Sequence, residues 1–155
     1  MLIRNILEES VRKFDEVKAV KWLKKKEIME RSYGELMENV VSTRKGLLAE
    51  GFEGKHIALI GTSSVEWMES YLGIITGCTT AVPLDAALPC EDLIDLLNRS
   101  DSAALFLSPK LKPYLDAFLE NCPKLQKVWM LQEEVEDAPA KVYGIGELRN
   151  AGKSA

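Results

Sequence analysis

The sequence predicts an α/β domain built on a parallel, doubly wound sheet with helices on both faces, together with an antiparallel hairpin near the N-terminus. Short apolar runs alternate with segments of helical periodicity, and such a run is typical of a parallel strand buried on both faces. Parallel strands joined through helices follow right-handed crossovers, so successive units add to one sheet. Four strands of this sheet are expected at residues 56–60, 79–84, 103–107 and 127–131.

The N-terminal part precedes this alternation and has a different pattern. Apolar residues recur at helical spacing over residues 1–14, which predicts an amphipathic helix. Residues 19–23 and 28–31 predict two short strands around a lysine-rich turn. A hairpin is therefore expected between this first helix and the alternating part of the chain.

The helix that follows the hairpin is recognised by its two ends. Ser32 is followed three residues later by Glu35, which is the spacing of a capping box. Gly51 is a suitable glycine for the position just after the last turn. One apolar side of this helix is expected to consist of Leu36, Val40, Val41, Leu47 and Leu48.

The helices between the strands carry similar signals. Ser63 or Ser64 is expected to cap the first of them, and Gly77 to end it. Two more helices are expected at residues 91–99 and 109–121. The apolar face of the first helix is expected to consist of Trp67, Met68, Tyr71, Leu72 and Ile75.

Length and composition indicate one compact globular domain. The chain has 155 residues, of which 46% are hydrophobic and 28% charged, and both fractions are near the globular average. The net charge of −4 gives no broad field that attracts nucleic acid or an anionic membrane. The N-terminus lacks the apolar core of a signal peptide, and no apolar run is long enough to span a bilayer. A cytoplasmic location is expected.

The three cysteines, Cys78, Cys90 and Cys122, are widely spaced and have no histidine near them. Their number and spacing argue against a disulfide framework and against a zinc site. Cys78 has apolar neighbours and is expected to be a small core residue. A reducing compartment fits this pattern.

The turns after the predicted strands are the first places to look for a ligand site. The turn at Gly61 holds one glycine, so neither a dinucleotide fingerprint nor a Walker loop is present. The helix that begins near Ser63 has an N-terminus that attracts anions, but capping is the favoured role of this serine. Asp85 follows a strand, and a turn-stabilising carboxylate is favoured over a ligand.

Other side chains with potential chemistry lack the neighbours that chemistry requires. His56 has no acidic or thiol partner close in sequence, and Ser108 lies in no nucleophile elbow. The three tryptophans have apolar neighbours, which favours core packing over ligand stacking: Trp22, Trp67 and Trp129. We therefore assign no catalytic, cofactor-binding or metal-binding residue in this chain.

Taken in order, five segments resemble the start of the adenylate-forming enzymes, the superfamily of acyl-CoA synthetases, luciferases and peptide-synthetase adenylation domains. Ser32 to Leu36 resembles a "(T/S)-Y-x-E-L" segment, and Ser64 to Trp67 resembles "N-S-x-E-W". The other three are residues 51–60, 72–85 and 91–100. The similarity covers roughly residues 1–131. The phrases "V-K-W", "S-V-E-W" and "V-P-L-D" are most similar to long-chain fatty acyl-CoA synthetases.

This resemblance implies a ligase that uses ATP to activate a carboxylate as an acyl-adenylate and then transfers the acyl group to CoA, with Mg²⁺ as a cofactor. The sequence departs from the family at Lys55-His56, where Asp-Arg is usual, and at Ser63, where asparagine is usual. The family's phosphate loop, ribose-binding aspartate and catalytic lysine are absent from this chain. The resemblance therefore implies an N-terminal fragment that is inactive alone.

As a fragment, the chain is expected to form part of the family's large domain over residues 1–131, followed by an acidic connector and an unfinished segment over residues 132–155. Its expected partner is the remainder of its own polypeptide. A surface normally covered by that remainder predicts self-association or marginal stability.

Two alternatives stay open at this point. One keeps the superfamily and changes the substrate to an amino or aryl acid. The other is a freestanding, non-catalytic α/β binding or interaction domain. A phosphate loop with a lysine after Ala155 would favour the enzyme, and a natural stop codon would favour the freestanding domain.

Overall fold

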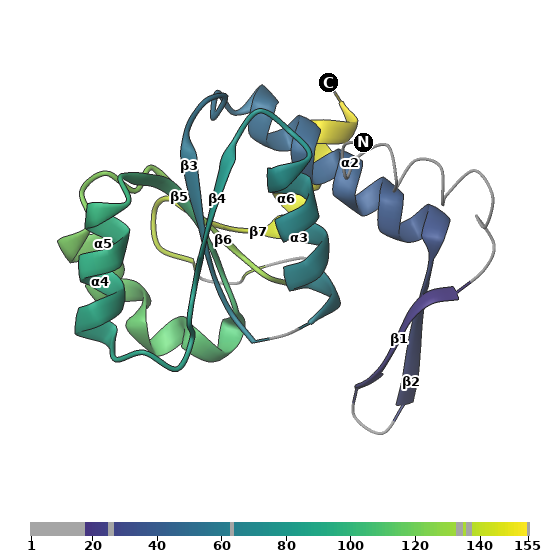
Figure 1. The fold of residues 1–155 in the computed structure, drawn as a ribbon, viewed down its shortest axis with the longest axis horizontal. Helices are drawn as coiled ribbons and strands as arrows, with labels where there is room; N and C mark the ends of the chain where they lie inside the picture. The colour runs from purple at the N-terminus through teal and green to yellow at the C-terminus, as the bar shows by residue number, and fades with distance from the viewer. Residues whose placement is uncertain (1–17, 25–26, 63, 133–134, 136–137, 155) are drawn as a thin grey trace.

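The computed structural model of the chain contains a five-stranded parallel sheet and a separate two-stranded antiparallel hairpin (Figure 1). The predicted fold class is confirmed. The helix predicted for residues 1–14 lies outside the described residues. The structure describes residues 18–24, 27–62, 64–132, 135 and 138–154.

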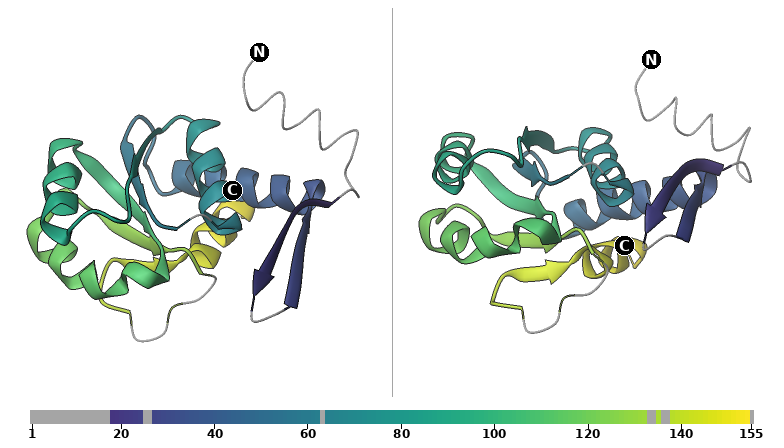
Figure 2. Two further views of the ribbon diagram at one scale, coloured as in Figure 1. Left: turned by 60° about the horizontal axis from the view of Figure 1, so that its bottom comes forward. Right: turned by 90° about the horizontal axis from the view of Figure 1, so that it is seen from below.

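The hairpin consists of β1 (Lys18–Lys24) and β2 (Glu27–Ser32), paired antiparallel as predicted. It projects from the first turns of α2 (Tyr33–Ala49) and does not join the main sheet (Figures 1 and 2). Its orientation therefore depends on contacts close to the point where β2 becomes α2.

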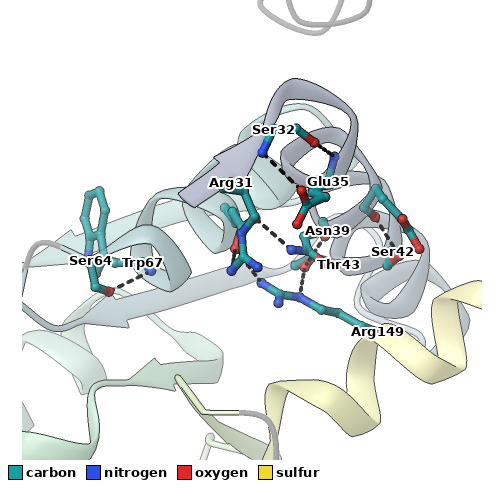
Figure 3. Close-up of polar contacts among 11 residues, drawn as sticks. Arg31, Ser32, Glu35, Asn39, Ser42, Thr43, Ser64, Trp67 and Arg149 are labelled. Atoms are coloured by element: carbon teal, nitrogen blue, oxygen red, sulfur yellow. Dashed lines mark hydrogen bonds and ion pairs between the residues drawn. The ribbon is translucent and has the colours of Figure 1, made fainter. Parts of the chain in front are cut away.

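The predicted capping box at the start of α2 is confirmed. The backbone N–H of Glu35 donates to Ser32 Oγ over 3.1 Å, and the backbone N–H of Ser32 donates to Glu35 Oε1 over 3.4 Å (Figure 3). Gly51 adopts φ +84°, a left-handed conformation that glycine accepts without strain. The predicted apolar side was wrong for Leu48, which is 54% exposed. Leu48 lies at the edge of the buried stripe that Leu36, Val40 and Leu47 form along α2 and has no neighbour among the described residues that covers it from solvent.

The parallel sheet has the strand order β4-β3-β5-β6-β7. Each of the four predicted strands is confirmed. The fifth, β7, arises within the stretch 132–155, which the sequence analysis interpreted as a connector and an unfinished segment. The strands are β3 (His56–Ile60), β4 (Thr80–Leu84), β5 (Ser102–Leu107), β6 (Lys127–Met130) and β7 (Val142–Gly144).

The connections between these strands are mostly helical, as predicted. One expectation was wrong, because the single helix expected at residues 109–121 is a 3₁₀ helix followed by a short α-helix. Pro113 has no N–H for the α-helical ladder, which explains the tighter first part. The helices are α3 (Val65–Ile75), α4 (Cys90–Arg99), η1 (Pro109–Tyr114), α5 (Leu115–Asn121) and α6 (Ile145–Lys153).

Helices cover both faces of the sheet, as Figure 2 shows. On one face α4 and α5 contribute Leu93, Leu97 and Phe118 to a core with alternate strand residues. On the other face α2, α3 and α6 cover residues such as Phe106 and Trp129. All six residues of β5 are buried, which places this strand at the centre of the fold.

Strands β4 and β7 are the two edges of the sheet within the described residues. The N–H of Thr80 donates to the Lys55 carbonyl over 3.0 Å, so this residue faces β3. Strand alternation then places Ala81 and Pro83 on the open side of β4, and Pro83 has no N–H to donate there. The self-association expected from sequence stays a prediction.

No helix of the described part of the chain combines the length and the apolar character needed to cross a membrane.

Helices α2 and α6 pack through glycines. A Cβ added to Gly152 would lie 2.1 Å from the carbonyl oxygen of Ser42, and one added to Gly46 would lie 2.3 Å from the carbonyl oxygen of Leu148. Both neighbours are backbone atoms, which cannot move without moving a helix. The close approach of α2 and α6 therefore requires glycine at both positions.

We expect Gly152→Ala to destabilise the chain by roughly 1–3 kcal/mol, even though alanine favours a helix, because the added methyl group forces α6 away from α2. Urea denaturation measures the change in the free energy of unfolding. Asn150→Ala, an exposed position on α6, is the matched control and should change stability by less than about 0.5 kcal/mol. Equal effects of the two substitutions would contradict the role of the glycine.

Candidate functional site

The topology of the sheet points to one edge for ligand binding. From β3 the chain crosses to β4 on one side and then returns to place β5 on the other side of β3. In open α/β sheets, ligands bind at the carboxyl ends of the strands where such a reversal occurs. The loops that follow β3, β4 and β5 are therefore the candidate region.

The loops after β3 and β5 meet at this point. The N–H of Ser108 donates to the Ile60 carbonyl over 2.9 Å, and the hydroxyl oxygens of Thr62 and Ser108 lie 3.5 Å apart. A Cβ on Gly61 would lie 3.1 Å both from Ser108 Cβ and from Trp67 Cδ1. Glycine at this position lets α3 and the loop after β5 approach the end of β3 closely.

A cavity of about 630 Å³ lies beside these loops, within the size range of small-molecule sites. Most of its lining side chains are apolar or aromatic. It is bounded by the end of β3, the loop after β4, the start of α3 and the helix η1. The lining residues are Gly61, Thr62, Trp67, Leu84, Asp85, Ala86, Ala87, Lys110, Leu111, Pro113 and Tyr114.

Trp67 forms one wall of the cavity from the first turn of α3. Its backbone N–H donates to Ser64 Oγ over 3.1 Å, so Ser64 is the cap of this helix (Figure 3). The Trp67 ring stacks on the Tyr71 ring with centroids 5.3 Å apart and planes 11° apart. The sequence predicted core packing for Trp67, but the side chain is only half-buried. Ser63, the other predicted cap, lies outside the described residues.

Two charged side chains line the cavity. Asp85 Oδ1 accepts a hydrogen bond from the Ala87 N–H over 2.9 Å, which confirms the turn-stabilising role predicted for this carboxylate. Lys110 makes no hydrogen bond or ion pair with any residue that the structure describes. The cavity therefore combines an apolar wall, a carboxylate that caps a turn, and an ammonium group with no partner among the described residues.

The remaining residues singled out from sequence lie away from this cavity. His56 begins β3, at the opposite end of the strand, and its Nδ1 lies 2.7 Å from the Ser100 carbonyl oxygen. Trp129 is buried in the core as predicted, while Trp22 lies in β1.

The cysteine predictions were only partly correct. Cys78 is exposed, contrary to the prediction that it is a core residue, because it lies in the turn between α3 and β4. Burial raises the pKa of the Cys122 thiol, so this buried cysteine is held in its unreactive, protonated form. Among the described residues, no three His, Cys, Asp or Glu side chains are grouped so that they could hold a metal ion.

A buried carboxylate that the sequence analysis did not single out joins four elements. Glu69 of α3 is fully buried and accepts hydrogen bonds from Arg31 Nη2 of β2 over 3.1 Å and from Asn39 Nδ2 of α2 over 2.8 Å. Arg149 Nη2 of α6 lies 3.6 Å from Glu69 Oε1, and its Nε donates to Thr43 Oγ1 over 3.2 Å. Figure 3 shows the side chains of Arg31 and Arg149 lying near each other, although they come from β2 and α6.

This arrangement corrects the predicted face of α3. The fully buried residues are Val65, Glu69, Ser70, Gly73 and Ile74, whereas the larger apolar residues predicted to face the core are half-buried. Gly73 permits the approach, because a Cβ there would lie 2.8 Å from the Thr43 side chain. Burial raises the pKa of Glu69 in spite of its hydrogen bond from Asn39 and its two arginine partners.

Comparison with protein families gives one match. Residues 7–151 match the model of the AMP-binding enzyme family. The chain belongs to this family. Comparison with curated protein sequences found no match.

Solved structures of similar fold include three ligases. Coronafacic acid ligase from Pectobacterium brasiliense superposes with a TM-score of 0.85 at 20% identity, over 97% of this chain and 29% of that one. The anthranilate CoA ligase AuaEII, in complex with anthranoyl-AMP, gives 0.80 at 17% identity, over 94% and 27%. A putative long-chain-fatty-acid CoA ligase from Rhodopseudomonas palustris gives 0.79 at 11% identity, over 96% and 36%.

At these low identities, the superpositions establish a shared fold, that of the N-terminal domain of adenylate-forming enzymes. The chain spans about 27% to 36% of the length of these structures. Two of the sequence segments that resemble the family border the cavity. Residues 64–67 form the capped start of α3, and residues 72–85 run from α3 through β4 to the turn at Asp85.

We expect Arg149→Met to lower the free energy of unfolding at pH 7 by about 3–5 kcal/mol, because it leaves the Glu69 carboxylate buried without one of its cations. Loss of this cation raises the pKa of Glu69 further above the ordinary value of 4.5. The variant then keeps the Glu69 proton to a higher pH than the wild type does, so the deficit grows as pH rises from the raised wild-type pKa of Glu69 to the still higher pKa in the variant, and it is smaller below that window. Urea denaturation at several pH values measures both effects.

Arg99→Met is the matched control for this prediction. Arg99 pairs with Asp95 on the surface of α4, with 77% and 56% of the two side chains exposed. Its removal should change stability by no more than about 0.5 kcal/mol. A pH-independent loss in the Arg149 variant would show that the lost packing of the arginine matters and that its charge does not.

Proposed function

We propose that this chain is the N-terminal portion of an ATP-dependent acid–CoA ligase. The observation that carries the proposal is the match to the AMP-binding enzyme family over residues 7–151. Support also comes from the superposition on acid–CoA ligases over nearly the whole chain. In the proposed reaction, a carboxylate and ATP give an acyl-adenylate and pyrophosphate, and CoA then displaces AMP from the acyl group.

The described residues do not themselves fit the groups that this reaction needs. They offer no cluster of acidic side chains for Mg²⁺, and the turn at Gly61 has one glycine where a triphosphate loop needs several. We therefore assign the sites for ATP, Mg²⁺ and CoA to the remainder of the polypeptide, the proposed partner of this chain. Its own contribution is a rigid α/β layer that supports those sites.

A long-chain fatty acid is the substrate that we propose for the whole protein, and the cytoplasm is its proposed location. The sequence phrases "S-V-E-W" and "V-P-L-D" support the fatty acid, as does the fold shared with the putative long-chain-fatty-acid CoA ligase. The anthranilate and coronafacic acid ligases share the fold equally well, so an aryl or other compact acid is the second candidate.

The proposed function is tested by acid-dependent exchange of labelled pyrophosphate into ATP. We expect the 155-residue chain alone to show no exchange, because the sequence lacks the family's phosphate loop and catalytic lysine, which would stabilise charge on the transferring phosphorus. A protein that extends through the family's phosphate loop and catalytic lysine should show exchange with palmitate and much less with anthranilate.

Faster exchange with anthranilate than with palmitate would make an aryl acid the substrate and would still support the ligase activity. Absence of exchange with every acid in the extended protein would contradict the ligase itself and favour the binding-domain alternative. Exchange by the 155-residue chain alone, in proportion to its concentration, would contradict the assignment of the chemistry to the remainder.

A further inference from the structure

We propose that the cavity at the carboxyl ends of the strands is a binding site for a ligand that joins a flat apolar ring to an anionic group. The cavity is carried entirely by this chain, at the position where an α/β sheet binds ligands. The proposal goes beyond the acid–CoA ligase activity, because it concerns direct binding to described residues and requires neither ATP nor CoA.

The apolar ring is inferred from the wall at Trp67. Tyr71 covers one face of the indole and is not among the residues that line the cavity, so the cavity is bounded by the opposite face or the rim. The tight contact at Gly61 and the cap at Ser64 fix the position of this side chain. A flat ring placed here gains aromatic contact without the cost of ordering the wall.

The remaining wall supports the same ligand chemistry. Leu84 ends β4, while Leu111 and Tyr114 come from η1 on the other side of the cavity, and all three are half-buried. Both half-buried leucines offer apolar surface that a ring would remove from water. The ring therefore finds apolar contact on two sides of the cavity.

The anionic group is inferred from the balance of the two charged lining residues. The Asp85 carboxylate accepts a hydrogen bond from the Ala87 N–H, whereas Lys110 has no partner among the described residues. A ligand anion supplies the partner that Lys110 lacks within the described part of the chain, and a carboxylate or a phosphate does so by the same charge-assisted hydrogen bond. A cationic ligand would meet only the partly occupied Asp85 and would be repelled by Lys110.

A series of four probes with one ring tests the inference on the 155-residue chain. The probes are 2-naphthoate, 2-naphthyl phosphate, 2-naphthalenemethanol and 2-naphthylmethylamine. Isothermal titration calorimetry measures affinity, and amide and indole NMR shifts locate the site. We expect both anions to bind with a Kd of about 0.1–1 mM, the alcohol several-fold more weakly, and the amine most weakly. The shifts should centre on Gly61, Thr62 and the Trp67 indole.

Two lysines of the same 3₁₀ helix provide a matched pair of variants. Both lysines are exposed, but Lys110 lines the cavity and Lys112 does not. We expect Lys110→Met to weaken binding of 2-naphthoate about threefold to tenfold and to abolish its salt dependence, while Lys112→Met leaves both unchanged. Asp85→Asn keeps a hydrogen-bond acceptor for the turn and should strengthen binding of the anions.

Three other outcomes overturn the proposal or part of it. Absence of saturable binding by every probe up to several millimolar overturns the site. Equal binding of the alcohol and the anions would contradict the inference that the ligand is anionic. Preferred binding of the amine would show that the ligand carries a positive charge. A difference between naphthoate and naphthyl phosphate identifies the source of the anion. Exchange activity in the extended protein does not bear on any of these results, so the two proposals fail separately.

Discussion

The burial of strand β5 on both faces is the constraint on which the rest of this fold depends. It pairs with β3 on one side and with β6 on the other, and all six of its residues are buried. Such a strand is stable only if helices cover both faces of the sheet, and crossovers to either side supply them. The same crossovers bring the ends of β3 and β5 together, where the Thr62 and Ser108 hydroxyls lie close.

The two faces of the sheet are covered in chemically different ways. Helices α4 and α5 bury leucine and phenylalanine side chains in an ordinary apolar layer. Helices α2, α3 and α6 approach one another more closely, through glycines, and enclose the carboxylate of Glu69 with its arginine partners. An apolar contact tolerates small shifts, whereas a buried charge loses its compensation when its partners move. The polar cluster thus fixes the relative positions of three helices and of strand β2, whose Arg31 takes part.

Local signals explain why so much of the fold was predictable. The capping box at Ser32, the glycine at position 51 and the four apolar strands each depend on residues close together in sequence. Strand β7 has only three residues after an acidic stretch, which is too short to show a period. The buried face of α3 was predicted wrongly because a glutamate in a helix is usually exposed. The partners that allow Glu69 to be buried, Arg31 and Arg149, are 38 and 80 positions away in the sequence.

The candidate cavity was predictable in part for the same reason. The turns at Gly61 and Asp85 follow apolar strands, and the rule for parallel sheets places them at one edge. The cavity wall that η1 forms was not predictable, because a regular α-helix was expected across Pro113. The 3₁₀ geometry of η1 determines that Lys110, and not Lys112, lines the cavity. Such a choice depends on the path of the backbone, which periodicity does not encode.

Pro83 has a consequence for how the sheet ends. On the open side of β4, a strand added in register would need donors from residues 81 and 83, and only Ala81 has one. A ladder extended along this edge therefore lacks one hydrogen bond, at Pro83. Proline in an outer strand limits growth of the sheet by misfolded copies.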